Sequence, residues 1–367
     1  MKTSYNLLPT LCVGRAYTAT QSIAKRAFIL FLLGLAALLL FSGCQPSSII
    51  PSPIPDASQT PPPETATPFL PATATQTSPP PTLAPLTATP PRPAIERVLI
   101  ITVDGLRPDV IPLAPMPNLL AMMEEGSYSL TAQTIFPSST LPAHASIFTS
   151  MCPDKHGVDW NDYLPKRGFA QGPDLFKIAH DAGLKTVLIV GKEKLQQITP
   201  PENLDVFEFV NDRDSVVAEQ AAPIISEGFD LMFIPLPLVD ILGHEHGWMS
   251  PNYIIGAFRA DEAIGMILAA LDESGLREGT LIIVTADHGG DVILKHGGRN
   301  PAAMTVPWIL TGASLNPRAI QRPIGVVDTG ATAAFALNLP IPSIWDGIPV
   351  FEAFGENSPA RVELPCQ

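Results

Sequence analysis

The chain has 367 residues, 46% of them hydrophobic, and carries a formal net charge of -13. This length allows one large domain or two ordinary ones. The acidic balance argues against a nucleic-acid-binding module, which normally presents a basic face. It leaves room for a small anionic substrate, because bound metal ions can reverse the local field of a site.

The N-terminal segment predicts export from the cytoplasm. Residues Ala27–Phe41 form a continuous apolar run preceded by Arg15, Lys25 and Arg26. The run is shorter than the ~20 residues that span a bilayer as a helix. A basic segment before a short apolar stretch is typical of a secretory signal. The alternative is an uncleaved N-terminal anchor helix, and both interpretations place the rest of the chain outside the cytoplasm.

The apolar run ends in Phe41-Ser42-Gly43-Cys44, which resembles the lipobox of bacterial lipoproteins. One departure is Phe41, which stands where leucine is usual. The resemblance implies a lipoprotein-type signal peptide over residues 1–43. It also implies that Cys44 is lipidated and anchors the protein to the cell membrane.

Residues 45–93 have the composition of a disordered linker. They are rich in Pro, Thr, Ser and Ala, and their only charges are Asp56, Glu64 and Arg92. Proline disfavours helices and central strands and favours extended, semi-rigid segments. We therefore expect a single catalytic domain over residues 94–367.

Cys152 and Cys366 are the two cysteines of that domain. Neither belongs to a C-x-x-C pair, so a cysteine-built zinc site is not expected. The two could form a disulfide in an oxidising compartment. Their spacing in the sequence leaves open whether they meet.

Alternating strand and helix patterns begin after Arg97 and predict an α/β fold. Helices are expected at 252–271 and 329–339, where periodic apolar positions lie between helix-start and helix-stop residues. Alternation of this kind predicts a mostly parallel central sheet with helices on both faces. Five short apolar runs, rich in β-branched residues as in buried strands, lie at 98–103, 186–190, 229–235, 281–285 and 306–310.

Aspartate and histidine residues cluster just after the predicted strands, where open α/β sheets form their sites. Each could belong to an ordinary turn. Together they supply six ligands, enough for two metal sites of three protein ligands each, with an open position as in catalytic zinc sites. Zinc suits the mixed carboxylate and imidazole set, with manganese and iron as alternatives. The six residues are Asp104, Asp240, His244, Asp287, His288 and His296.

The segment from Ile135 to His144 contains a candidate nucleophile. Pro142 and the apolar positions after it predict a helix that begins near Thr140. A hydroxyl at a helix N-terminus lies among free N–H donors, a favourable place for a phosphoryl group. The alternative is that Thr140 or Ser139 only caps the helix.

These motifs resemble, in order and approximate spacing, the type I phosphodiesterase/nucleotide pyrophosphatase family of the alkaline phosphatase superfamily. The matching segments are Asp104, FPSST-LPAH, DILGH, TADHGG and KHGG, and the resemblance covers essentially all of residues 97–352. The resemblance implies an alkaline-phosphatase-like fold and the hydrolysis of phosphodiester or nucleotide pyrophosphate bonds in a small phosphate ester, such as a nucleotide or a head-group diester.

The resemblance also implies roles for particular residues. Thr140 would be the nucleophile, forming a phospho-threonine and touching one of two divalent ions, with zinc the expected metal. Asp104, Asp287 and His288 would hold that ion. Asp240, His244 and His296 would hold the other. Asn161, with the backbone N–H near Leu141, would stabilise the developing negative charge.

Departures from the family pattern fall at Ala143, Ser150 and Leu242, none of them an expected ligand. His144, His156 and His246 are interpreted as structural or supporting residues. The chain lacks the C/S-x-P-x-R motif of sulfatases. A phosphomonoesterase or phosphonate hydrolase of the same superfamily stays open, as does a surface lipoprotein that binds a ligand without catalysis.

Overall fold

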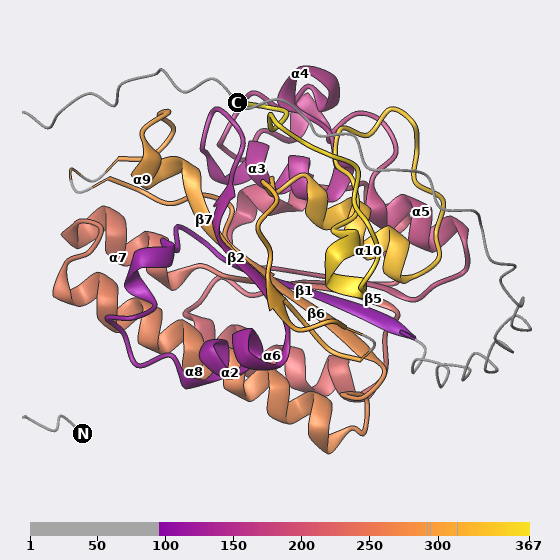
Figure 1. The fold of residues 1–367 in the computed structure, drawn as a ribbon, viewed down its shortest axis with the longest axis horizontal. Helices are drawn as coiled ribbons and strands as arrows, with labels where there is room; N and C mark the ends of the chain where they lie inside the picture. The colour runs from indigo at the N-terminus through magenta and orange to yellow at the C-terminus, as the bar shows by residue number, and fades with distance from the viewer. Residues whose placement is uncertain (1–94, 292, 294, 314) are drawn as a thin grey trace, which may run out of the picture. The chain divides into compact units, whose positions relative to one another are not determined.

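The computed structural model describes residues 95–291, 293, 295–313 and 315–367. The predicted signal peptide, Cys44 and the linker lie outside these residues. Within them, the chain forms one twisted sheet covered by helices on both faces (Figure 1). Among the helices of this part, none combines the length and apolar character needed to cross a membrane.

The sheet has eight strands in the described part of the chain, in the order β4-β3-β5-β1-β6-β7-β2-β8. All run in one direction except β7, which is antiparallel to both of its neighbours. The strands are β1 (Arg97–Val103), β2 (Ser127–Gln133), β3 (Thr186–Val190), β4 (Val206–Phe209), β5 (Leu231–Leu236), β6 (Thr280–Thr285), β7 (Thr305–Thr311) and β8 (Arg318–Ala319).

The centre of the sheet is buried on both faces, which explains its continuous apolar sequence. β1 lies between β5 and β6, and Val98 is in register with Leu231 on one side and Leu281 on the other. Every residue of β5 and β6 is buried, as expected for parallel strands covered by helices. Because the registers align, the carboxyl ends of these three strands lie side by side.

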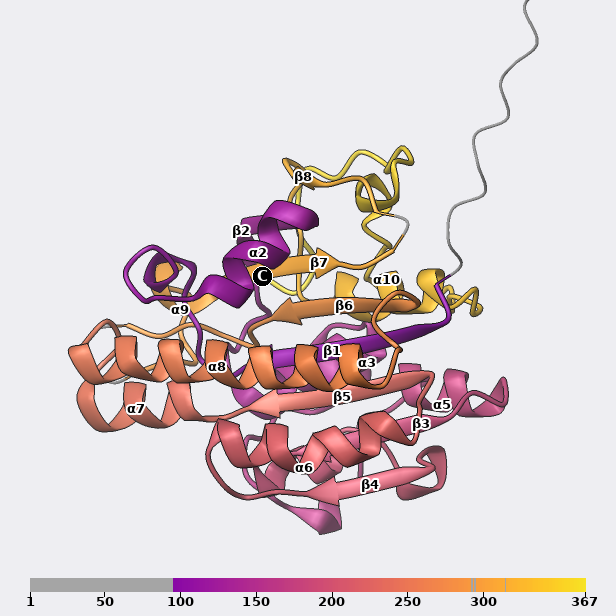
Figure 2. The same ribbon diagram turned by 90° about the horizontal axis from the view of Figure 1, so that it is seen from below.

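Helices α2, α6, α7 and α8 cover one face of the sheet, and α3, α5 and α10 cover the other (Figures 1 and 2). Four-residue helices complete the connections near α3 and β7. The helices are α2 (Pro117–Glu125), α3 (Thr140–Thr149), α4 (Pro153–His156), α5 (Leu175–Asp181), α6 (Asp214–Ser226), α7 (Leu238–His246), α8 (Pro251–Glu273), α9 (Pro301–Met304) and α10 (Asp328–Ala336).

The predicted α/β fold is confirmed, and each of the five predicted strands corresponds to an observed one, β1, β3, β5, β6 and β7. The helices expected at 252–271 and 329–339 are α8 and α10. The sequence did not anticipate β2, β4 and β8, nor that the segment carrying Asp240 and His244 would form a helix, α7.

The C-terminal segment is fastened to the body of the domain. Cys366 forms a disulfide with Cys152 at the start of α4, so the pair that the sequence left open is formed. Gln367 donates a side-chain hydrogen bond to the carbonyl of Thr134, and Phe136 donates its N–H to the carbonyl of Cys366. The tail is therefore held against the segment that leads into α3.

Candidate functional site

The carboxyl edge of the central strands gathers the acidic and imidazole side chains singled out in the sequence. Asp104 follows β1 directly, and Asp287 and His288 follow β6. Asp240 and His244 lie one helical turn apart on α7, so both point to the same side of that helix.

Two compact groups of three ligands result. Each residue of Asp104, Asp287 and His288 offers one ligand atom, and these atoms lie within 4.8 Å of one another. Asp240, His244 and His296 form a second group with the same property. The first group is buried, whereas the His244 side chain of the second is 46% exposed. The second group is therefore the one that opens toward solvent.

Gly105 allows the two groups to approach. It has φ of +74°, and a Cβ atom built there would lie 3.0 Å from the Cα and Cβ atoms of Asp240. A side chain at this position would be strained and would push α7 away from the end of β1. The Gly105 carbonyl is fixed by hydrogen bonds from Trp248 and Tyr253.

The three aspartates share a pattern in which one carboxylate oxygen is hydrogen-bonded within the protein and the other is not. Asp287 Oδ1 accepts the N–H groups of Gly105 and His288 at 3.1 and 2.9 Å. Asp104 Oδ2 and Asp240 Oδ2 both accept from the Lys192 ammonium. The remaining oxygens, Asp104 Oδ1, Asp240 Oδ1 and Asp287 Oδ2, are buried without a hydrogen-bond partner in the described structure. Such oxygens are destabilising unless they bind a cation, so the site fits metal ions.

Two of the histidines are oriented by backbone carbonyls. Nδ1 of His288 lies 2.8 Å from the carbonyl of Gly289, and Nδ1 of His296 lies 2.9 Å from that of Ser138. A carbonyl only accepts, so Nδ1 must donate, and in the neutral ring Nε2 keeps its lone pair. Nε2 of His296 lies 3.0 Å from Nε2 of His244, so the two candidate ligand atoms are close enough to bind the same ion. Ordered imidazole ligands usually have such a carbonyl partner.

The electrostatics of the site favour the entry of positive charge. Burial, reinforced by Asp287, raises the pKa of Asp104 to about 7. Burial works against protonation of His288, yet the carboxylates of Asp287, Asp240 and Asp104 raise its pKa above the ordinary value. Burial, with His288 nearby, lowers the pKa of His296 to about 4, which leaves its ring neutral at pH 7. In the absence of another cation, protons are therefore favoured on Asp104 and His288.

Thr140 lies beside the first group, at the position that the sequence predicted for a helix start. It is the first residue of α3 and is buried, and its Oγ1 lies 3.3 Å from His288 Nε2. Ser139 occupies the capping position but makes no capping hydrogen bond with its side chain. The capping interpretation is therefore wrong for Ser139, and the Thr140 hydroxyl points to the acidic cluster.

Asn161 contacts the first turn of α3 through its side chain. Its Oδ1 accepts the N–H of Leu141 at 2.9 Å. This contact fixes the orientation of the amide, because only the oxygen can accept, and it leaves the two Nδ2 hydrogens for other partners. The Leu141 N–H is engaged in this structure, contrary to the expectation that it would itself serve as a donor at the site.

The three supporting histidines lie outside the two ligand groups. His144 is buried, with Nδ1 2.8 Å from the carbonyl of Thr140 and Nε2 2.9 Å from the hydroxyl of Thr102. His156 is buried against Ser146. His246, at the end of α7, is exposed.

Lys192 is the residue of the site that sequence reasoning missed. It follows β3 by two residues, and its side chain is 17% exposed. Burial opposes its charge, but Asp104 and Asp240 raise the pKa of its ammonium above the ordinary value. The signal available in the sequence was its place after a buried strand, at the same edge as Asp104 and Asp287. A lysine is not an expected metal ligand, so the ligand pattern in the sequence does not point to it.

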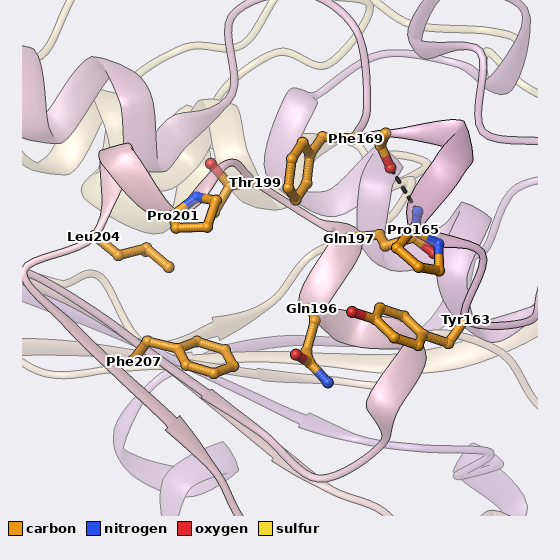
Figure 3. A pocket seen from close by; sticks show the side chains of 10 residues that line it. Tyr163, Pro165, Phe169, Gln196, Gln197, Thr199, Pro201, Leu204 and Phe207 are labelled. Atoms are coloured by element: carbon orange, nitrogen blue, oxygen red, sulfur yellow. Dashed lines mark hydrogen bonds between the residues drawn. The ribbon is translucent and has the colours of Figure 1, made fainter.

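A separate pocket of about 190 Å³ lies along the segments that follow Asn161 and Lys192 in the chain. Figure 3 shows the rings of Tyr163, Phe169 and Phe207 arranged around it, with Gln196 beside Tyr163. Aromatic faces with amide groups between them can receive a planar organic group. Further lining residues are Pro165, Gly168, Gln197, Thr199, Pro201 and Leu204.

Comparison with known proteins gives a consistent result at the level of sequence. The profile of the family "Type I phosphodiesterase / nucleotide pyrophosphatase" matches residues 98–183 and 184–300. An uncharacterized pyrophosphatase/phosphodiesterase of Schizosaccharomyces pombe is 26% identical over 219 residues, which cover 52% of this chain and 44% of that protein. The chain spans about half or less of the length of the curated relatives it matches.

Solved structures share the fold at low sequence identity. A 2-O GAG sulfatase is similar with a TM-score of 0.60 and 16% identity, covering 73% of this chain and 75% of that one. Murine ectonucleotide pyrophosphatase/phosphodiesterase 5, in an inactive T72A form in complex with AMP, is similar with a TM-score of 0.57 and 16% identity. That similarity covers 70% of this chain and 98% of that one.

Proposed function

The chain belongs to the type I phosphodiesterase/nucleotide pyrophosphatase family, and from that premise we propose that it is an exported, metal-dependent hydrolase of phosphodiester or nucleotide pyrophosphate bonds. The observation that carries the proposal is the position of the Thr140 hydroxyl, at a helix N-terminus beside two groups of three ligands. This arrangement supplies a nucleophile and sites for two cations around one point.

Two divalent ions are the proposed cofactors, with zinc as the proposed metal. Asp104, Asp287 and His288 would hold one, with Thr140 beside it, and Asp240, His244 and His296 would hold the other. The three unpartnered carboxylate oxygens support this assignment. When bound, the ions would supply Lewis-acid stabilisation of the negative charge on the attacking and leaving oxygens.

Thr140 would act as the covalent nucleophile. Its Oγ1 forms a bond to phosphorus while the bond from phosphorus to the leaving oxygen breaks, and the hydroxyl proton passes to solvent. The leaving group takes up a proton from water. A water molecule then attacks phosphorus from the opposite side, the Oγ1–P bond breaks, and Thr140 regains its proton.

Asn161 would stabilise the charge that develops on phosphorus. Since the Leu141 N–H fixes the amide oxygen, the Nδ2 group is available to donate to a non-bridging phosphoryl oxygen. Donors held in place before the reaction are effective because they need no reorganisation in the transition state.

The pocket of Figure 3 supports a substrate with an organic group on phosphorus. Tyr163 and Gln196, which line this pocket, follow Asn161 and Lys192 in the chain by two and four residues. The AMP complex of the murine relative supports a nucleotide as that group. The second candidate is a phosphomonoesterase or phosphonate hydrolase with the same nucleophile and metals.

The proposed function is tested by comparing two nitrophenyl substrates on the full-length chain purified in detergent with added zinc. We expect kcat/KM for a nitrophenyl nucleotide diester to exceed that for nitrophenyl phosphate by at least about tenfold. Chelation should abolish both activities and zinc should restore them. A preference for the monoester would assign an exported phosphatase instead. Inactivity toward both substrates, with no bound metal, would favour the non-catalytic binding protein.

Export and lipid anchoring form the second part of the proposal. The disulfide between Cys152 and Cys366 supports an oxidising compartment, and the basic and apolar N-terminal pattern supports a cleaved signal. We expect labelled fatty acid to be incorporated into the wild-type protein and to be absent from Cys44→Ala. Equal labelling of the two proteins would exclude Cys44 as the lipid site, and a protein accessible only from the cytoplasm would exclude export.

A further inference from the structure

Lys192 contacts one aspartate from each of the two ligand groups. Its Nζ lies 2.7 Å from Asp104 Oδ2 and 2.5 Å from Asp240 Oδ2. These are the oxygens that do not face the histidine ligands. Asp104 Oδ1 lies 3.5 Å from His288 Nε2, and Asp240 Oδ1 lies 3.4 Å from His244 Nε2. Each carboxylate therefore has one oxygen for the lysine and one for the ligand group.

The backbone brings Lys192 to this position. β3 pairs with β5, so its carboxyl end lies at the same edge as Asp104. Gly191 directly follows β3, and a Cβ atom at this glycine would lie 3.2 Å from the ring of Pro237. Any larger residue would crowd Pro237, which directly precedes α7. The close approach carries the Lys192 side chain into the space between Asp104 and α7.

We propose that Lys192 is a shared positioning residue, which holds the outer oxygens of Asp104 and Asp240 so that their inner oxygens face the two metal ions. This inference rests on the proposed function, because it requires the two cation sites. Lys192 touches neither ion. It acts through two ligands, one in each site, and thereby couples the geometry of the two sites.

The physical reason is that a carboxylate ligand needs a partner for its second oxygen. Outer partners fix the rotamer of a ligand, and their loss typically weakens metal binding by about 10–100-fold. Asp104 and Asp240 lie on different elements, the end of β1 and helix α7. A single ammonium between them also reduces the repulsion between two buried negative charges, and breaking such a buried ion pair leaves charges without compensation.

The rival interpretation is that Lys192 only fills the place of the ions and moves away when they bind. The two interpretations predict opposite signs for one measurement. Removal of a positive charge from an empty site makes the site more negative, so a mere substitute cation, once removed, leaves zinc binding tighter. Removal of a positioning residue leaves zinc binding weaker.

The test is the affinity of the full-length chain for zinc alone, measured by competition with a fluorescent chelator, with zinc content measured by mass spectrometry. Lys192→Met removes the charge at similar length, and Lys192→Arg retains it. Lys194→Met is the matched control, a half-buried lysine of the same loop with no hydrogen bond to either aspartate in the described structure. Lys192→Gln, which can still donate one hydrogen bond, replaces the methionine variant if that variant does not fold.

We expect both zinc ions to bind at least about tenfold more weakly to Lys192→Met, and Lys192→Arg and Lys194→Met to stay within a few-fold of the wild type. Unchanged or tighter binding of either ion by Lys192→Met or Lys192→Gln would overturn the inference while leaving the proposed function intact. Equal weakening by Lys192→Arg would overturn it as well, because the charge would then not matter. A wild-type protein that binds no zinc would overturn both proposals.

Discussion

Replacement of Thr140 by alanine is expected to lower kcat for a nitrophenyl nucleotide diester by at least about 10⁴-fold, as the loss of a covalent nucleophile does in other hydrolases. The hydroxyl is buried next to His288. The ligands Asp104, Asp287 and His288 are untouched by the change, so zinc content should be retained. Single-turnover kinetics and metal analysis on the same preparation measure both quantities.

Thr140→Ser is the matched control for this prediction, because it keeps the hydroxyl and removes only a methyl group. We expect the serine variant to turn over and to form a covalent phospho-enzyme that acid quenching traps. Asn161→Ala should fall between the two, with a loss of about 10²–10³-fold, because it removes a charge-stabilising donor but leaves the nucleophile. Turnover by Thr140→Ala within tenfold of the wild type would rule out the covalent route.

The central strands could be predicted from the sequence because both of their faces are buried, which forces a continuous apolar run. β2 escaped prediction because its burial alternates along SYSLTAQ, and its polar residues give the run little apolar character. β4 escaped because it is a four-residue edge strand with exposed phenylalanines. Short or half-exposed strands are stabilised by pairing with neighbours, which local sequence does not show.

The two ligand groups could be assembled from the sequence because their members follow predicted strands and sheet topology collects strand ends at one edge. Helix α7 could not be foreseen, since Gly243 weakens its helical pattern. In the structure this glycine gives room to Trp248, whose ring a Cβ atom would approach to 2.8 Å. The Asn161 contact and the position of Lys192 depend on distances between segments that no spacing rule predicts.

The buried carboxylates that serve metal binding also lower the stability of the metal-free fold. Three aspartates are buried within one cluster, each with an oxygen that has no hydrogen-bond partner in the described residues. Such groups oppose folding unless a cation compensates them. A ligand that binds only the native state stabilises it, so zinc should raise the melting temperature of the wild-type protein. The same physical feature that creates the metal site thus makes stability depend on the metal.

Asp287→Asn is expected to abolish zinc binding at the first ligand group and to reduce turnover by at least about 10³-fold. The nucleophile Thr140 is retained, but the ion that would stabilise the charge on the reacting oxygens is lost. The asparagine oxygen can still accept the N–H groups of Gly105 and His288. Its amide nitrogen, however, replaces the free oxygen and presents hydrogens where a cation would bind. The variant should therefore fold normally but lose the metal at the first ligand group.

Melting curves with and without zinc distinguish this outcome from general damage. We expect the zinc-free variant to be at least as stable as the zinc-free wild type, since a buried carboxylate with one unpartnered oxygen has lost its charge, and to gain less from zinc. Asp261→Asn is the matched control, because this buried aspartate also accepts backbone N–H groups, those of Asn118 and Leu119. It should lose stability and keep its zinc. An Asp287→Asn protein that binds two zinc ions would show that Asp287 is not a ligand, since a neutral amide would then serve the site as well as the carboxylate does.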